Sequence, residues 1–263
     1  GRYISFVVYP FSFTEFQMAD PTLTFDQYIQ YGGMPFLSSI NFEPDISKNY
    51  LQDIFNSVTL KDIVKRNNIR DVDLLERIIA YALSNIGRSF SATSISKFFK
   101  AKNRTVAPET ILNHLKACEE AYLLYRLKSQ DINGKKILKV NEKYYVADHG
   151  LREAVIGANL QNVEIVLENI VGLELLRRGY KVCVGRVGRK EIDFVGEKQG
   201  DKLYVQVCYL LSDEATIQRE FGSLLEVRDN YPKMVLYQEG SFRGNYEGIP
   251  AIRIEDWLAE KNV

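Results

Sequence analysis

The stretch Glu191-Ile192-Asp193-Phe194-Val195 lies at the centre of the segment that decides the predicted fold. Apolar spacing predicts a helix before it, over 163–178, which Gly179 ends. The other predicted elements are strands at 180–186, 191–195, 203–209, 233–237 and 251–254, with a helix over 213–228. This α–β–β–β–α–β order predicts an α/β sandwich with a mixed sheet, within a chain that is α+β overall.

Four positions in this segment form a pattern typical of one kind of site: Glu168 on the first helix, Asp193 on the second strand, and Gln206 and Cys208 on the third. The pattern resembles the PD-(D/E)XK nuclease superfamily. In active members of that superfamily a helix Glu, a strand Asp and the acid of an E-x-K pair hold Mg²⁺, and the Lys helps to activate water. Here Gln206 stands in place of the second acid and Cys208 in place of the lysine. We therefore expect a vestigial site that binds no metal and does not catalyse.

An alternative is a Mg²⁺-dependent nuclease that uses Glu168 and Asp193, with Glu174 or Glu191 as a further acid. Lys190 or Lys202 would then have to replace the missing lysine.

Glu174 is a candidate buried acid, because it falls inside the apolar arc of the predicted helix over 163–178. A carboxylate in such a position is either functional or paired with a cation. Arg177 and Arg178 flank the arc, so a structural ion pair is the alternative to a functional role.

The middle of the chain, residues 71–152, predicts a winged helix-turn-helix. Three amphipathic helices are expected over 74–87, 91–102 and 108–121. Two strands follow at 122–127 and 136–140, and Asn133-Gly134 between them is a strong hairpin signal. Three helices followed by a two-stranded ribbon are typical of this fold.

Charge in this middle segment suggests contact with DNA. Between Arg88 and Lys143 lie twelve basic and five acidic residues, a net charge of +7 in a chain whose 34 basic and 34 acidic residues cancel. Such a surface attracts the phosphate backbone. A protein-interaction or regulatory module is the alternative. The candidate DNA-binding residues are Lys97, Lys100, Lys102, Arg104, Lys135, Lys136 and Lys139.

The start of the chain, residues 1–70, predicts a half-buried strand over 1–10 and then helices. Gly1-Arg2-Tyr3, Tyr31-Gly32-Gly33-Met34-Pro35 and Lys61-Asp62-Ile63-Val64-Lys65-Arg66 resemble the last core strand and the lid of predicted bacterial and archaeal AAA+ ATPases. Glu174-Leu175-Leu176-Arg177-Arg178-Gly179-Tyr180 resembles the C-terminal domain of that family, residues 153–263 here.

This resemblance implies a full-length protein that uses ATP and Mg²⁺ and forms homo-oligomers through its ATPase core. It also implies that this core contacts the region formed by the present chain. The G-x-x-x-x-G-K-[ST] phosphate loop does not occur in this sequence. The stretch from Gly185 to Lys190 has the wrong spacing and fits a hairpin turn. We therefore expect no nucleotide cofactor in this chain.

Composition limits the remaining classes. Hydrophobic residues make up 46% and charged residues 26%, which is typical of a globular protein. No apolar run approaches the roughly 18–20 residues of a membrane helix. Three widely spaced Cys residues fit a reducing cytosol better than a disulfide framework, so a cytoplasmic location without membrane contact is expected.

Overall fold

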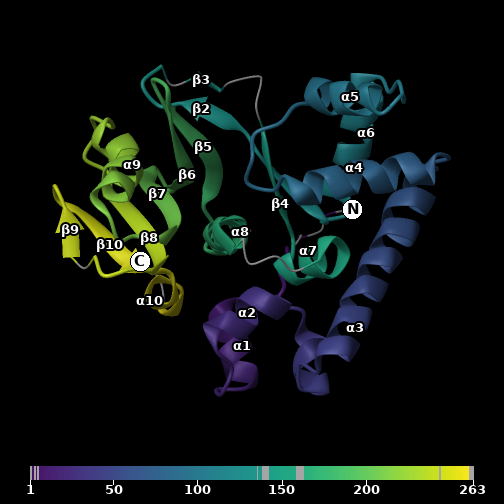
Figure 1. Cartoon of the computed structure of the whole chain (residues 1–263), viewed down its shortest axis with the longest axis horizontal. Coiled ribbons are helices and arrows are strands. Elements are labelled where there is room, and N and C mark those ends of the chain that lie inside the picture. The colour runs from purple at the N-terminus through teal and green to yellow at the C-terminus, as the bar shows by residue number, and fades with distance from the viewer. Residues whose placement is uncertain are drawn as a thin grey trace.

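An eight-stranded mixed sheet organises the C-terminal part of the chain, in the order β3-β2-β5-β6-β7-β8-β10-β9 (Figure 1). The computed structural model describes residues 2, 4, 6–134, 136–137, 142–157, 163–242 and 244–260, without the side chains of 136–137. Strand β6 is antiparallel to both of its neighbours, β5 and β7, whereas β8 runs parallel to both β7 and β10. The bounds are β5 Lys181–Val187, β6 Lys190–Lys198, β7 Asp201–Leu210, β8 Lys233–Glu239, β9 Gly244–Tyr246 and β10 Ile249–Arg253.

Helices cover both faces of this sheet. On one face Phe194 and Val205 belong to the same buried cluster as α8 (Val163–Arg177). On the other face Tyr204 and Cys208 pack in a second cluster with Phe221 of α9 (Glu214–Leu225). A short last helix, α10 (Ile254–Ala259), follows β10. The mixed α/β class and the predicted order of helix and strands are confirmed; β9 and α10 were not predicted.

The three predicted helices of the middle segment are present as α4 (Val72–Ser84), α5 (Ala92–Ala101) and α6 (Pro108–Glu120). Ser91 caps α5, as its side chain accepts a hydrogen bond from the backbone N–H of Ser94. The expected pairing of the two following strands is wrong. Strand β1 (Leu124–Leu127) pairs with β4 (Lys143–Val146).

The Asn133-Gly134 turn does form a hairpin, but between two other strands, β2 (Ser129–Asp131) and β3 (Lys136–Ile137). Strand β2 also pairs in parallel with β5, so this hairpin extends the C-terminal sheet. The hairpin signal fixed the turn correctly, whereas the partner of each strand depends on sheet contacts far away in sequence.

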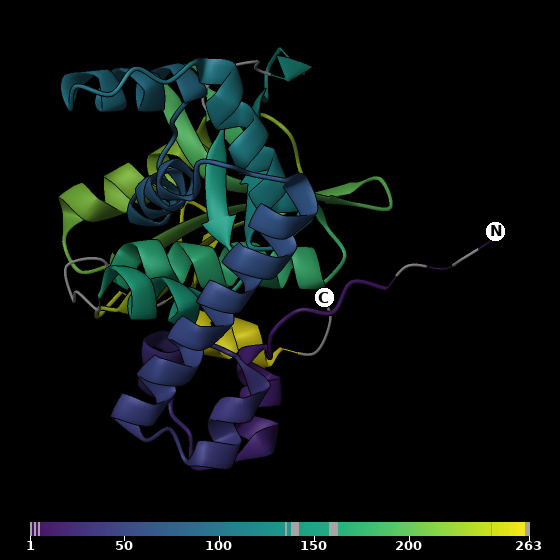
Figure 2. The ribbon, with the colours of Figure 1, turned by 90° about the vertical axis from the view of Figure 1, so that its right-hand side faces the viewer.

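The N-terminal segment is helical, with α1 (Phe13–Ala19), α2 (Phe25–Tyr31), the 3₁₀ helix η1 (Pro35–Ile40), α3 (Pro44–Ser57) and the π-helix η2 (Val58–Lys65). The strand expected over 1–10 is wrong for its described residues, which form no ladder with a neighbouring strand. Figure 2 shows the described residues at the start of this segment extending away from the rest of the chain. A strand needs a partner, and the described part of the chain offers this segment none.

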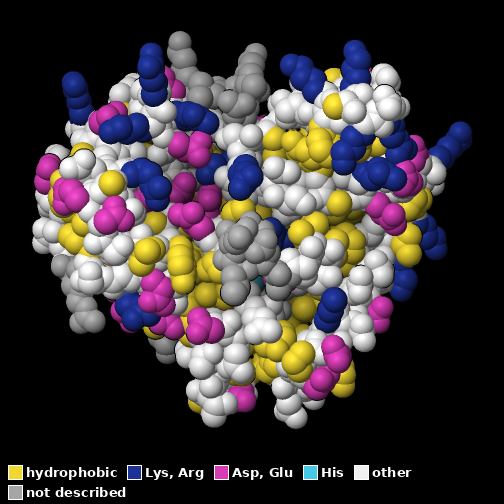
Figure 3. Space-filling view, viewed as in Figure 1, with side chains coloured by type: hydrophobic (Ala, Val, Ile, Leu, Met, Phe, Trp, Pro, Cys, Tyr) yellow, Lys and Arg dark blue, Asp and Glu magenta, His cyan; other side chains and the backbone are white. Residues whose placement is uncertain are grey.

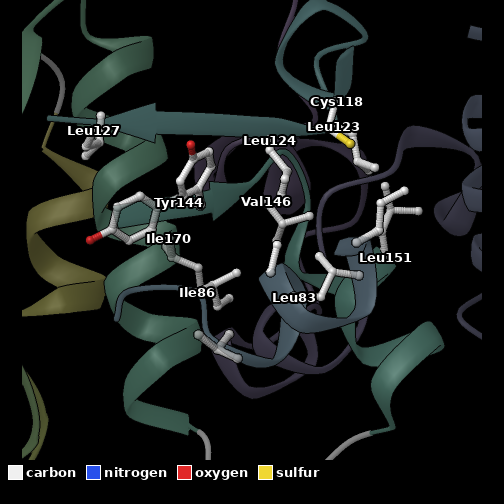
Figure 4. Packing of buried hydrophobic residues seen from close by; sticks show 14 of the residues in the cluster. Leu83, Ile86, Cys118, Leu123, Leu124, Leu127, Tyr144, Val146, Leu151 and Ile170 are labelled. Atoms are coloured by element: carbon white, nitrogen blue, oxygen red, sulfur yellow. The ribbon is translucent and has the colours of Figure 1, made fainter. Parts of the chain in front are cut away.

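One buried cluster joins the N-terminal helices to the rest of the molecule. Figure 4 shows its centre, where side chains from α4, α6, β1, β4, α8 and the helix α7 (His149–Ile156) meet. Asp148 caps α7 and accepts a hydrogen bond of 2.7 Å from the backbone N–H of Gly33, which ties the N-terminal helices to α7. The division at residues 70 and 152 stays a prediction: the cluster extends across both boundaries, and the sheet extends across residue 152.

Candidate functional site

A buried lysine surrounded by three acids forms the most concentrated polar site of the described chain. The Lys143 side chain is 3% exposed, and its Nζ lies 2.8 Å from Glu168 Oε1 and 2.9 Å from Glu191 Oε1. Asp193 Oδ1 is 3.6 Å from the same nitrogen. We call these four residues the Lys143 cluster. It contains both acids that the sequence pattern placed in the site, together with a lysine that it did not.

Three elements position the cluster. Strand β4 carries Lys143, α8 carries Glu168, and β6 carries Glu191 and Asp193. The contact between β4 and α8 is fixed by Asn169, whose amide accepts from the Val146 N–H at 2.8 Å and donates to the Val146 carbonyl at 3.0 Å. The buried side chain of Asn169 thus satisfies both the N–H and the C=O of Val146. Because Val146 and Lys143 belong to the same strand, this contact fixes the position of the lysine relative to α8.

Tyr145 completes the surroundings of Glu168. Its hydroxyl donates a 2.6 Å hydrogen bond to Glu168 Oε1, the same oxygen that accepts from Lys143. Gly87 lies on the other side of this carboxylate, and a Cβ there would come within 2.9 Å of Glu168 Oε2. A side chain at Gly87 would therefore force Glu168 to move.

Asp193 is enclosed, and its backbone and side chain are both hydrogen-bonded. Its Oδ2 accepts from the Val207 N–H at 3.0 Å, and its own N–H donates to Gln206 Oε1 at 3.3 Å. Burial, followed by the neighbouring charge of Glu168, raises the pKa of Asp193 to about 8, although Lys143 opposes this rise.

The pKa of Lys143 is raised, although burial alone would lower it. Removal from water by itself lowers the pKa of Lys143, but the carboxylates of Glu168, Asp193 and Glu191 outweigh that effect and raise it above the usual value. The lysine is therefore charged throughout the physiological range. The outer oxygen of Glu191 is paired with Arg186 Nη2 at 2.7 Å, which adds a second cation to the cluster.

Gln206 links the cluster to α9. Besides accepting from the Asp193 N–H, its side chain is hydrogen-bonded to Glu220, which is 4% exposed and also pairs with Arg219 at 2.6 Å. Burial raises the pKa of Glu220. A pocket of about 290 Å³ opens beside these residues, lined also by Glu164, Arg88 and Gly87. The amide oxygen of Gln206 is thus used within the protein.

The residues present do not fit the Mg²⁺ that the nuclease-like pattern implies. An ammonium lies between the three carboxylates, and their oxygens accept from Tyr145, Arg186 and the Val207 N–H. With the side chains placed as they are in this structure, no group of three or more His, Cys, Asp or Glu residues among the described ones could hold a metal ion.

The other residues that sequence placed in or near this site lie elsewhere. Cys208 is fully buried in the hydrophobic cluster beneath α9, where burial raises the pKa of its thiol. Lys190 pairs with Glu226 at 2.8 Å, and Lys202 lies opposite Glu197 in the β6–β7 ladder. Neither replaces the missing lysine.

Glu174 forms ion pairs with Arg177 and Arg178, which is the structural alternative predicted from the sequence. Its carboxylate is 9% exposed and pairs with Arg177 and, at 2.8 Å, with Arg178. Arg177 also donates to the Pro10 carbonyl at 3.0 Å, and Arg178 donates to the Trp257 carbonyl at 2.8 Å. The acid therefore orients two arginines that hold the N-terminal segment and α10.

The predicted DNA-binding residues separate into distinct groups. Lys97, Lys100 and Lys102 are exposed on or just after α5, where Lys102 Nζ lies 4.5 Å from the centre of the Phe98 ring. Arg104 instead pairs with Asp71 at 2.7 Å and with Asp73. Lys135 and Lys139 lie outside the described residues, and so does the side chain of Lys136.

We call Lys97, Lys100 and Lys102 the α5 lysines. Basic side chains gather over α5 and its neighbours at the upper right of Figure 3.

Sequence reasoning missed Lys143 and Tyr145. Lys143 was counted only as part of the basic middle segment. The lysine opens the strand Lys143–Val146, all four residues of which are buried, and this burial becomes evident only in the folded chain. A lysine in a fully buried strand requires acidic partners.

Comparison with known proteins shows the family of this chain. It belongs to the family described as "Domain of unknown function (DUF8612)", which matches residues 22–162. An uncharacterised protein of Haemophilus influenzae (strain ATCC 51907 / DSM 11121 / KW20 / Rd) is 35% identical over 268 residues, which cover 99% of this chain and 66% of that protein.

An uncharacterised protein of Methanocaldococcus jannaschii is 27% identical over 283 residues, which cover 97% of this chain and 60% of that protein. The chain thus spans less than two thirds of the length of either relative. No solved structure matches it significantly. Within the described residues, no helix has the length and apolar character needed to cross a membrane.

Proposed function

We propose that this chain binds DNA through the α5 lysines and that it is the region following the nucleotide-binding core in a longer AAA+-type ATPase. In this proposal its nuclease-like segment is not catalytic. The observation that carries the DNA-binding part is the charge of the α5 surface: residues 89–108 contain four basic residues and no acidic ones, and Lys97, Lys100 and Lys102 are all exposed.

The α5 surface has the chemistry of a phosphate-backbone contact. Three ammonium groups lie within six residues, beside the ring of Phe98, which is 38% exposed. Lysines of this kind attract phosphates irrespective of sequence, and each neutralised phosphate releases counter-ions from the duplex. We therefore infer backbone contact rather than reading of bases.

The ATPase part of the proposal draws support from the N-terminal segment. Ile4, Phe6 and Val8 alternate along the chain and are 82%, 84% and 89% exposed. Alternating apolar residues are typical of a strand that buries one face. A nucleotide-binding core in the full-length protein would cover this face, in line with the relatives that extend beyond the matched region.

Anisotropy of a labelled duplex, titrated with the chain across a range of salt concentrations, tests DNA binding. Three phosphate contacts give a slope of about −2.7 in a plot of log K against log salt. The triple variant Lys97→Ala/Lys100→Ala/Lys102→Ala should bind more weakly and lose most of this slope. The matched control removes three exposed cations from other elements: Lys48, Lys181 and Arg189.

Equal losses in both triple variants would show that net charge, and not the α5 surface, binds DNA. No binding at low salt would refute the DNA part and favour a protein-interaction module. The same samples, run on a gel with and without Mg²⁺, test the nuclease alternative. Cleavage that Asp193→Asn abolishes would contradict a non-catalytic segment, whereas intact DNA is the result expected from the Lys143 cluster.

A further inference from the structure

The Lys143 ammonium has the position and partners of a bound cation. It is supplied by β4, whereas the three acids around it belong to α8 and β6. Its two short contacts, 2.8 Å to Glu168 and 2.9 Å to Glu191, are charge-assisted hydrogen bonds, and the carboxyl group of Asp193 lies 3.6 Å away as a third neighbour. Its exposed fraction of 3% means that these carboxylates take the place of its hydration shell.

A divalent cation and this ammonium cannot share the cluster. Mg²⁺ requires oxygen ligands at about 2.0–2.1 Å, and the lysine nitrogen occupies the space between the same oxygens. Without the ammonium, three carboxylates would face one another in a largely dehydrated site, which is the situation in which acids bind a metal or take up protons.

We propose that Lys143 is a tethered counter-ion that takes the place of a divalent cation between Glu168, Glu191 and Asp193. Removing its ammonium then turns the cluster into a divalent-cation site. This inference deepens the non-catalytic part of the proposed function and rests on it, but it does not depend on DNA binding.

The tether has a mechanical consequence. Because β4 is paired with β1, directly after the three helices, the ammonium fastens that part of the chain to the sheet and α8. Tyr145 and Val146 continue the same contact through Glu168 and Asn169. Cation binding by the acids and the contact of the Lys143 ammonium with α8 and β6 are therefore mutually exclusive.

Titration of the full chain with Mn²⁺ and, separately, Mg²⁺ tests this proposal in the absence of DNA. Calorimetry measures the affinity. Lys143→Met keeps an unbranched apolar stem and removes the charge. The matched control, Lys143→Met/Asp193→Asn, removes one anionic ligand as well. We expect Lys143→Met to bind one Mn²⁺ per chain about tenfold or more tightly than the wild type, and the double variant to lose that gain.

Two results would overturn the proposal: saturable Mn²⁺ binding by the wild type that Asp193→Asn abolishes, or a folded Lys143→Met that gains no affinity. Should Lys143→Met unfold without metal, circular dichroism replaces calorimetry for the variants. Recovery of structure by Mn²⁺ in the single but not the double variant supports the proposal, and failure to recover contradicts it. Duplex anisotropy on the wild type reports separately on DNA binding, so the two proposals can fail independently.

Discussion

Replacing Asp193 by Asn should make the protein more stable at neutral pH, because this substitution removes a carboxyl group that folding forces to keep its proton. In the folded chain Asp193 is 8% exposed, and burial together with Glu168 raises its pKa to about 8 from an unfolded value near 3.8. Its contribution to stability is fully present below about pH 4 and is lost as the pH rises towards about 8.

The size of the effect follows from this linkage. Between these two pKa values the folded state binds one more proton than the unfolded state, so the free energy of unfolding falls by about 1.4 kcal/mol per pH unit. From pH 5 to pH 7 the wild type should lose roughly 2–3 kcal/mol from this group. Asn has the same shape, keeps an oxygen to accept from the Val207 N–H, and does not titrate.

Urea unfolding at pH 5, 6, 7 and 8 measures the difference. Between pH 5 and pH 7 the stability of Asp193→Asn relative to the wild type should increase by about 2–3 kcal/mol. Asp201→Asn, on an exposed residue at the start of β7, controls for the loss of one formal charge. A wild type that is more stable than Asp193→Asn at pH 7 would refute the reasoning, since it would mean that an ionised Asp193 pairs with Lys143.

Two further substitutions test the polar contacts around α8. Glu174→Gln leaves two half-buried arginines without their acid and should cost about 2–4 kcal/mol, or roughly 5–10 °C in Tm. A loss below about 1 kcal/mol would mean that the pairs with Arg177 and Arg178 contribute little. Tyr145→Phe removes the hydroxyl that donates to Glu168 and should cost about 1–2 kcal/mol in urea unfolding. An unchanged Tyr145→Phe protein would show that Lys143 alone satisfies that oxygen.

Local signals in the sequence predicted helix ends well. Gly179, at φ +83°, follows the end of α8 as predicted, and Ser91 begins α5. Each of these signals acts within four residues, so it can be read without knowledge of distant contacts. The same is true of Asn133-Gly134, which sets a turn. Which strand then pairs with β1 depends on where the C-terminal sheet lies, and that information is not local.

The candidate site was predicted only in part for the same reason. Glu168 and Asp193 were found because their order along a helix and a strand forms a recognisable pattern. Lys143 lies 25 residues before Glu168, in a segment whose basic residues all indicated DNA, and only the folded chain brings it between the acids. Arg104 shows the converse: it was assigned to DNA, but its partners Asp71 and Asp73 lie 33 and 31 residues away.

The neutral side chain of Gln206 and the buried ammonium of Lys143 depend on each other. Gln206 accepts from the Asp193 N–H with its oxygen and is hydrogen-bonded to the buried Glu220, so it needs a donor and an acceptor on one side chain. A glutamate could not donate to Glu220 and would add a negative charge beside Asp193. Lys143, with Arg186 beside Glu191, suffices for this cluster only because position 206 is uncharged. The Gln206 amide therefore has two effects: it is a poor ligand for a metal ion, and it allows Lys143 to occupy the space between the acids.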